Sequence, residues 1–141
     1  MPAPTNPKRN EPVPATSRAS RWPRPILPRA HAYFDALAFP AILGLAAWMW
    51  PRNRPAALLI ASNGLLEGTT AAITNFPPPG PFPRISFRTH IRIGLIGAPL
   101  FLAISSLVPG ILGRYRRVVL GLGVVPLVVN GLSNATSETA A

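Results

Sequence analysis

The chain has 141 residues, of which 48% are apolar and only 13% are charged, whereas a soluble domain typically carries about 25% charged residues. Its 14 Lys and Arg against four Asp and Glu give a net charge of +10, but the positive residues cluster between apolar stretches, which is typical of the ends of membrane helices and argues against nucleic acid as a partner. The absence of cysteine excludes disulfides and sulfur-ligated zinc sites.

The N-terminal segment, residues 1–25, is rich in Pro, Ser and Arg and has no apolar periodicity. Such a segment buries too little apolar surface to offset the entropy lost on ordering. We therefore predict a disordered basic tail, followed by a membrane domain over residues 26–137 and a short tail over residues 138–141.

Four apolar segments follow, over residues 32–50, 55–76, 93–112 and 118–137. A membrane-spanning helix needs about 20 residues, and the segments reach that length when the polar end of the last one is counted. Their internal prolines are tolerated in membrane helices, because neighbouring groups satisfy the freed carbonyls. The sequence predicts an all-α polytopic membrane protein with four transmembrane helices in a lipid bilayer.

The Lys and Arg residues divide unequally between the two sides of such a four-span protein. The side with both termini and the 77–92 connection carries nine of them, and the side with the loops at 51–54 and 113–117 carries five. Positive residues are retained on the cytoplasmic side. We therefore expect a protein of the bacterial inner membrane with both termini in the cytoplasm.

The first and third segments begin alike. Residues 26–40 read ILPRAHAYFDALAFP and residues 85–99 read ISFRTHIRIGLIGAP, so Ile-x-x-Arg-x-His recurs, and a proline follows it at the same distance in both copies. The interval along the sequence from His31 to His90 therefore defines a repeat spacing, which all four matched positions share.

The second and fourth segments also share a motif. Asn-Gly-Leu begins at Asn63 and again at Asn130, and matching these two positions requires about eight extra residues in the second copy. Internal repeats are a known feature of membrane proteins. We interpret the pattern as two copies of a helical hairpin, over residues 26–76 and 85–137.

Small residues accompany the Asn-Gly-Leu motif. Gly64 and Gly68 are four residues apart, and this pairing matches them with Gly131 and Ala135. Small residues at this spacing let two helix backbones approach closely. We expect these positions to serve helix packing within the bundle.

These features resemble the SPW-repeat group of bacterial membrane proteins. The resemblance rests on the repeated Ile-x-x-Arg-x-His opening, the proline that follows it, and the hairpin ending Glu-Gly-Thr-Thr-Ala-x-x-Thr-Asn-Phe at residues 67–76. It covers residues 26–137 and implies four helices built as two hairpins, in a family with no established activity. It also implies an acidic residue four positions after each histidine, which is Asp35 in the first copy but Gly94 in the second. The family's Ser/Ala-Pro-Trp signature is replaced by Trp48-Met49-Trp50-Pro51.

A stripe of polar residues marks the second and fourth segments, where the spacing places them on one helix face. They are Asn63, Glu67, Thr70 and Thr74 in the second segment and Asn130, Asn134 and Ser137 in the fourth. We expect the stripe to face the bundle interior, because lipid offers these groups no partner. Glu67 is either a proton- or cation-binding carboxylate or a hydrogen-bonded residue that fixes helix register.

Two histidines open the odd-numbered segments, each two residues after an arginine. One interpretation makes Arg29, His31, Arg88 and His90 interfacial anchors for lipid phosphate. The other makes the two histidines, with Asp35 nearby, a weak ligand site, for example for bis-histidine haem or a metal ion. Neither histidine belongs to a sequence spacing typical of metal sites, so no cofactor is predicted.

Function follows only in outline from these features. No complete catalytic set is present in the sequence, which disfavours an enzyme and favours a structural or interaction module that packs with itself or with a membrane partner. The alternative is a small transporter or proton-coupled protein centred on Glu67 and the stripe containing Asn63 and Asn130.

Overall fold

Four α-helices make up most of the structure. The computed structural model describes residues 23–135, with helices α1 (Pro28–Met49), α2 (Arg54–Ala72), α3 (Phe87–Leu107) and α4 (Gly113–Leu132). Two short strands, β1 (Thr74–Asn75) and β2 (Ile85–Ser86), lie between α2 and α3. The prediction of an all-α fold is confirmed. Most of the predicted N-terminal tail, the predicted C-terminal tail and Ser137 lie outside the described residues.

Side-chain caps mark the starts of two of the helices, α2 and α3. Asn53 caps α2, because its Oδ1 accepts a hydrogen bond from the Ala56 backbone N–H at 2.9 Å. Ser86 caps α3 in the same way, through Thr89 N–H at 3.2 Å. The interior prolines at positions 40, 99 and 126 lie within α1, α3 and α4 without ending them.

Three of the helices, α1, α3 and α4, are long and apolar enough to cross a membrane. α2 has 19 residues, a similar length, but it falls short in hydropathy because it carries polar residues of the predicted stripe, including Asn63 and Glu67. The structure therefore confirms that three of the predicted segments form helices long and apolar enough to span a membrane. A fourth span stays a prediction.

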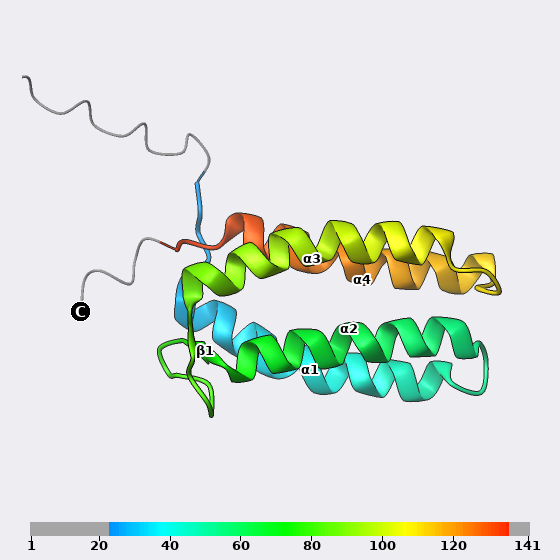
Figure 1. The fold of residues 1–141 in the computed structure, drawn as a ribbon, viewed down its shortest axis with the longest axis horizontal. Helices are drawn as coiled ribbons and strands as arrows, with labels where there is room; N and C mark the ends of the chain where they lie inside the picture. Colours follow the sequence, from blue (N-terminus) through cyan, green and yellow to red (C-terminus); the bar gives the residue numbers. More distant parts are fainter. Residues whose placement is uncertain (1–22, 136–141) are drawn as a thin grey trace, which may run out of the picture.

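The helices form two antiparallel hairpins, α1–α2 and α3–α4, which lie one above the other with their long axes aligned (Figure 1). Both short loops lie at one end of the bundle, and the strands lie at the other end, beside the starts of α1 and α3. Strands β1 and β2 pair in parallel, and an isolated parallel bridge joins Ile26 to Ser133. The strand pair joins the end of the first hairpin to the start of the second. The bridge joins the start of the first hairpin to the end of the second.

The helix starts recur at the repeat spacing. The interval from the start of α1 to that of α3 (28 to 87) equals the interval from the start of α2 to that of α4 (54 to 113), and both equal the interval from His31 to His90. The loops over residues 50–53 and 108–112 differ by one residue, so the eight extra residues required by pairing Asn63 with Asn130 are absent. That pairing is wrong, because the repeat spacing places Asn63 opposite Leu122.

Glycines allow the close packing inside each hairpin, although not all those predicted. A Cβ atom on Gly64 would lie 2.8 Å from Ile42 Cγ2, and one on Gly123 would lie 2.7 Å from Leu102 Cδ2. A Cβ atom on Gly131 would have nothing within 4 Å. The position equivalent to Gly64 at the repeat spacing is therefore Gly123. The packing role predicted for Gly131 is wrong.

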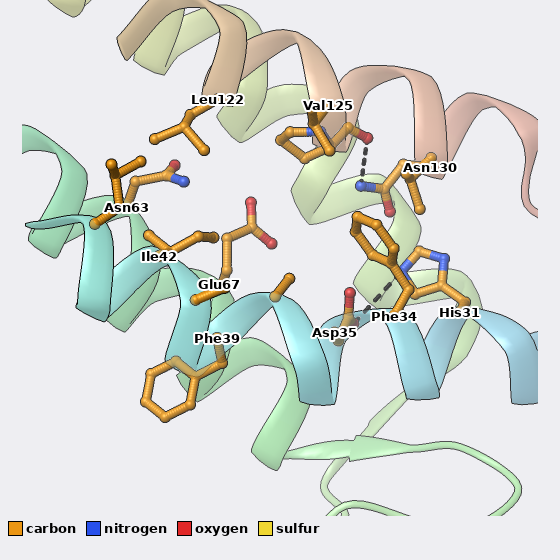
Figure 2. A pocket seen from close by; sticks show the side chains of 15 residues that line it. His31, Phe34, Asp35, Phe39, Ile42, Asn63, Glu67, Leu122, Val125 and Asn130 are labelled. Carbon is orange, nitrogen blue, oxygen red and sulfur yellow. Dashed lines mark hydrogen bonds and ion pairs between the residues drawn. The ribbon is translucent and has the colours of Figure 1, made fainter. Parts of the chain in front are cut away.

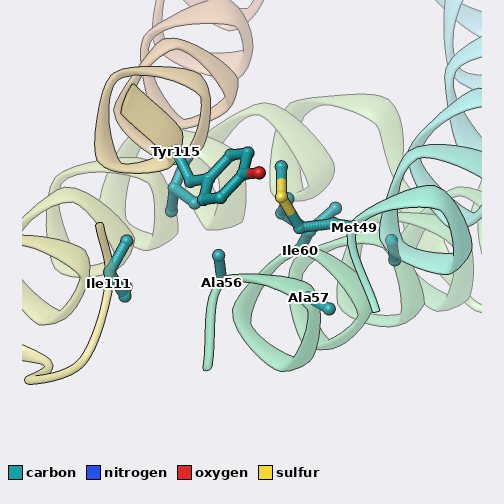
Figure 3. Packing of buried hydrophobic residues seen from close by; sticks show 8 residues of the cluster. Met49, Ala56, Ala57, Ile60, Ile111 and Tyr115 are labelled. Carbon is teal, nitrogen blue, oxygen red and sulfur yellow. The ribbon is translucent and has the colours of Figure 1, made fainter. Parts of the chain in front are cut away.

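Two apolar clusters join the hairpins at opposite ends. The larger one, near the loops (Figure 3), consists of Ala46, Met49, Ala56, Ala57, Ile60, Ile111, Tyr115 and Val119. The smaller one, near the strands, consists of Phe76, Phe87, Ile91 and Ala135. The space between the hairpins is therefore closed by apolar packing at both ends.

Candidate functional site

The two histidines of the chain meet at the strand end of the bundle. His31 lies in the first turn of α1 and His90 in the first turn of α3, and their Nε2 atoms are 3.2 Å apart. Each residue is only 1% exposed. The anchoring role predicted for the histidines is therefore wrong, because a buried imidazole cannot reach a lipid phosphate. Arg29 and Arg88 are exposed, so for them anchoring stays a prediction.

The Nδ1 atom of each histidine is held by a hydroxyl group. His31 Nδ1 lies 2.7 Å from Ser133 Oγ, and His90 Nδ1 lies 3.0 Å from Thr74 Oγ1. Each hydroxyl donates its single proton to the backbone carbonyl four residues earlier, at 2.7 Å from Ser133 and 2.6 Å from Thr74. Each hydroxyl must then accept from an Nδ1–H group. In the neutral form, each ring therefore carries its proton on Nδ1 and its lone pair on Nε2.

Asp35 completes the group. It lies one turn after His31, and its Oδ2 atom is 3.5 Å from His31 Nε2 and 3.3 Å from His90 Nε2. This buried oxygen has no hydrogen-bond partner. Three acceptor atoms thus converge, namely the two Nε2 atoms and Asp35 Oδ2. Such a group binds either a metal ion or an additional proton.

Two phenylalanines enclose the histidine pair. The Phe87 ring lies edge-on to the His31 ring at a centroid distance of 5.1 Å, and the Phe76 ring lies edge-on to the His90 ring at 5.3 Å. Both phenylalanines are buried. Their packing restricts rotation of the imidazoles and lowers the local dielectric, which strengthens electrostatic interactions at the site.

A cavity of about 250 Å³ lies between the hairpins and reaches the histidine site (Figure 2). Its wall is mostly apolar, and its polar members are His31, Asp35, Asn63, Glu67 and Asn130. Figure 2 shows the Glu67 carboxylate extending from α2 into this space. Of the four acidic residues in the chain, Asp35 and Glu67 therefore line one cavity.

The predicted polar stripe is only partly brought together. Asn63, Glu67 and Thr70 line the space between α2 and α3, but the structure records no hydrogen bond from Glu67 to Asn63 or Asn130 among the described residues. The Thr70 hydroxyl and the Asn130 amide instead donate to carbonyls of their own helices, at 2.8 and 2.7 Å. The Thr74 hydroxyl contacts His90 and donates to the Thr70 carbonyl, and the Asn134 backbone N–H donates to Ile26 at 2.8 Å.

Asn130 occupies the space beside position 94 in α3. The resemblance implied a second acid at position 94, where the chain has glycine. A Cβ atom at Gly94 would lie 2.7 Å from Asn130 Cγ, so the asparagine fills the space that an acidic side chain would need. Asn130 Oδ1 is also buried without a hydrogen-bond partner.

The sequence left open whether the two histidines act as separate anchors or as one ligand site, and the structure brings them together. The available signal was the repeat spacing itself. Two packed copies of one hairpin bring equivalent residues together when those residues face the contact between the copies. Thr74 and Ser133 are separated by the same interval, and they make equivalent contacts.

Comparison with known protein families, curated proteins and solved structures finds no match to this chain. The SPW-repeat resemblance therefore stays a prediction. The function has to be argued from the geometry of the fold and the site.

Proposed function

We propose that the chain is a four-span membrane protein in which two duplicated hairpins form a structural module around a buried His–Asp–His group. The contact between His31 and His90 carries this proposal. It places the starts of α1 and α3 at the same end of the bundle. If α1 and α3 both cross the bilayer, the chain must return between them.

α2 is the helix that makes this return. It runs antiparallel to α1 after a loop of residues 50–53, and its 19 residues extend about 28 Å at 1.5 Å per residue, close to the ~30 Å hydrocarbon core. Its polar residues Asn63 and Glu67 lie against the other hairpin and not on its outer side. The return therefore places few polar groups in lipid.

The outer surface supports contact with lipid. Several large apolar side chains on the outer faces of the helices are strongly exposed; they include Leu37, Leu66, Ile96 and Leu107, at 74, 69, 72 and 82% exposure. Exposed apolar surface on this scale is unfavourable in water. Near the loops, Arg52 and Arg54 lie over the rings of Trp48 and Trp50, at 4.2 and 5.6 Å, an arrangement suited to a membrane–water interface.

The repeated helix starts support a duplication. Helix starts, the interior prolines at 40 and 99, the packed glycines at 64 and 123, and the bridge residues 74 and 133 all recur at the repeat spacing. A parallel duplication places both copies in the same membrane orientation, around an axis along the membrane normal. The basic N-terminal tail favours cytoplasmic termini in a bacterial inner membrane.

Cysteine accessibility tests the four-span topology, since the chain has no native cysteine. Single substitutions Pro25→Cys, Pro51→Cys, Phe82→Cys and Leu112→Cys leave every basic residue in place. In intact cells, an impermeant thiol reagent should label positions 51 and 112 but not positions 25 and 82, which should react after permeabilisation. Equal labelling of positions 51 and 82 would show that α2 does not cross, and the reverse pattern would invert the orientation.

A second candidate function rests on the cavity. Two of the chain's four acids, Asp35 and Glu67, line a cavity between the helices. Carboxylates within a membrane domain are costly and commonly mark proton or cation pathways. Proton or cation passage centred on Glu67 is therefore the alternative to a purely structural module.

A further inference from the structure

We propose that His31, Asp35 and His90 form a binding site for a divalent transition-metal ion, and that Zn²⁺ fits this site. The inference does not depend on the number of membrane spans or on the orientation of the chain. It rests on the spacing of three ligand atoms, on the groups that hold the imidazole rings, and on a buried carboxylate oxygen without a partner.

The distances between the ligand atoms fit a tetrahedral shell. Four ligands at the ~2.0–2.1 Å typical of zinc lie about 3.3 Å from one another at tetrahedral angles, whereas ligands at right angles in an octahedral shell of that radius lie about 2.9 Å apart. The three separations among the two Nε2 atoms and Asp35 Oδ2 are 3.2, 3.3 and 3.5 Å. The three atoms therefore have the dimensions of one face of a zinc tetrahedron.

The imidazoles are held in the tautomer that binds metal. A ligating histidine needs a free lone pair on one nitrogen and usually donates from the other to a fixed oxygen. Ser133 Oγ and Thr74 Oγ1 accept from the two Nδ1–H groups, because their own protons are bound to carbonyls. Both Nε2 lone pairs consequently face Asp35 Oδ2 and each other.

The charge of the site also favours a bound cation. Asp35 Oδ2 is buried without a hydrogen-bond partner, and among the described residues the only ion-pair contacts of Asp35 are with the two histidines. Burial of an unpaired carboxylate is strongly unfavourable. A divalent ion supplies positive charge to all three acceptors at once and leaves each Nδ1–H bond intact.

The ligand set selects the type of ion. Imidazoles with one carboxylate suit zinc and neighbouring transition metals, whereas Mg²⁺ and Ca²⁺ prefer oxygen ligands. Haem does not fit between the histidines, because two axial nitrogens on one iron lie about 4 Å apart at ~2 Å per bond and here the Nε2 atoms are 3.2 Å apart. Three protein ligands leave the fourth tetrahedral position for water or a small ligand, and the adjoining cavity supplies the space.

Metal binding to the purified full-length chain tests the proposal. Its two histidines both belong to the site and it has no cysteine, so preparation without a polyhistidine tag removes other nitrogen or sulfur side-chain ligands for zinc. After EDTA treatment and dialysis in detergent, ZnCl₂ should restore about one Zn²⁺ per chain, measured by elemental analysis, while MgCl₂ should give none. With CoCl₂ in place of zinc, an intense visible absorption band typical of tetrahedral Co²⁺ should appear.

Three variants separate the site from the rest of the cavity. Asp35→Asn keeps the side-chain shape but removes the ligand charge, and Thr74→Val removes the group that holds His90. We expect Thr74→Val to weaken zinc affinity about 10–100-fold, as loss of such supporting groups does, and Asp35→Asn to weaken it at least as much. Glu67→Gln, which changes the other carboxylate of the cavity, should bind zinc with wild-type affinity.

Zinc should also stabilise the fold, because it would join α1 to α3. The melting temperature of wild type should rise on zinc addition, and that of Asp35→Asn should not. Circular dichroism verifies that each variant is folded before titration. Absence of stoichiometric zinc in folded wild type, equal loss of affinity in Glu67→Gln and Asp35→Asn, or equal binding of Mg²⁺ would each overturn the site, and a weak octahedral Co²⁺ spectrum would overturn its tetrahedral geometry.

Discussion

Gly94 and Gly97 lie about one turn apart on α3, but their surroundings differ. A Cβ atom on Gly94 would lie 2.7 Å from Asn130 Cγ, whereas one on Gly97 would have nothing within 4 Å. Asn130 is buried, and its Nδ2 is bound to a backbone carbonyl at 2.7 Å. The amide therefore cannot move aside without losing a hydrogen bond inside the bundle.

Substitution of these two glycines by alanine should have opposite effects. Gly94→Ala should lower the free energy of unfolding by about 1–3 kcal/mol, the usual cost of overpacking. Gly97→Ala should raise it by up to about 1 kcal/mol, because alanine is the better helix former. Equilibrium unfolding in mixed detergent micelles measures both. Equal effects of the two substitutions would show that Asn130 does not restrict position 94.

The hydroxyl groups that hold the histidines also bind backbone carbonyls at the ends of helices. Thr74 and Ser133 each follow the last turn of a helix, where backbone carbonyls lack partners within the helix. Each donates to the carbonyl four residues earlier and accepts from a histidine of the other hairpin. One side chain thereby caps a helix and orients a site residue.

At the scale of elements, the start of α2 is joined to the opposite hairpin. Asn53 Oδ1 caps α2 by accepting from Ala56 N–H, and Asn53 Nδ2 donates to the Gly110 carbonyl at 2.9 Å. Gly110 has a φ of 78°, a conformation that glycine adopts without strain. The two loops at this end are thus held together through one side chain.

Loss of this side chain should be measurable. Asn53→Ala removes a helix cap, at a cost of about 1 kcal/mol, and a hydrogen bond between the loops, at up to about 1 kcal/mol more. Asn53→Asp keeps the capping oxygen and loses only the donor, so it should cost less than Asn53→Ala. Unfolding free energies in micelles compare the two variants. An aspartate variant as unstable as the alanine variant would indicate that the loop contact, and not the cap, dominates.

The whole molecule is organised as two hairpins joined at their ends. Apolar clusters lie near the loops and near the strands, and the cavity containing Glu67 and Asp35 lies between them. The hairpins are thus packed together near both ends of the bundle and leave a cavity in between. Closer packing there would bury the polar residues against apolar side chains. The cavity is therefore a property of the assembled bundle and of no single helix.

Proton or cation passage through this cavity can be tested in liposomes. If the second candidate function holds, wild-type protein should dissipate an imposed pH gradient faster than protein-free liposomes, as followed with an enclosed pH-sensitive dye. Glu67→Gln should abolish the difference, since it keeps the shape of the side chain and removes the titratable carboxylate. A wild-type rate equal to that of protein-free liposomes would contradict proton passage and leave the structural module.

The sequence by itself determined the helices, the apolar character that makes three of them suited to span a membrane, and the repeat spacing of the two histidines. Length, apolar composition and local capping are encoded in neighbouring residues. The sequence predicted an inward position for Glu67, whose carboxylate does extend into the cavity, but it paired Asn63 with Asn130 through a match of only a few letters. The helix starts are a better guide to the alignment of the two hairpins than such a short match, because each start depends on a whole segment.

Only the tertiary structure decided that His31, Asp35 and His90 converge. These residues belong to different hairpins, and the apolar composition of each helix does not specify which of its faces meets the other hairpin. The packing of the two hairpins makes that choice, with Phe76 and Phe87 packed around the histidines and Asn130 beside position 94. Ligand geometry depends on differences of a few tenths of an ångström between atoms far apart in the chain, and these arise only when the hairpins are packed.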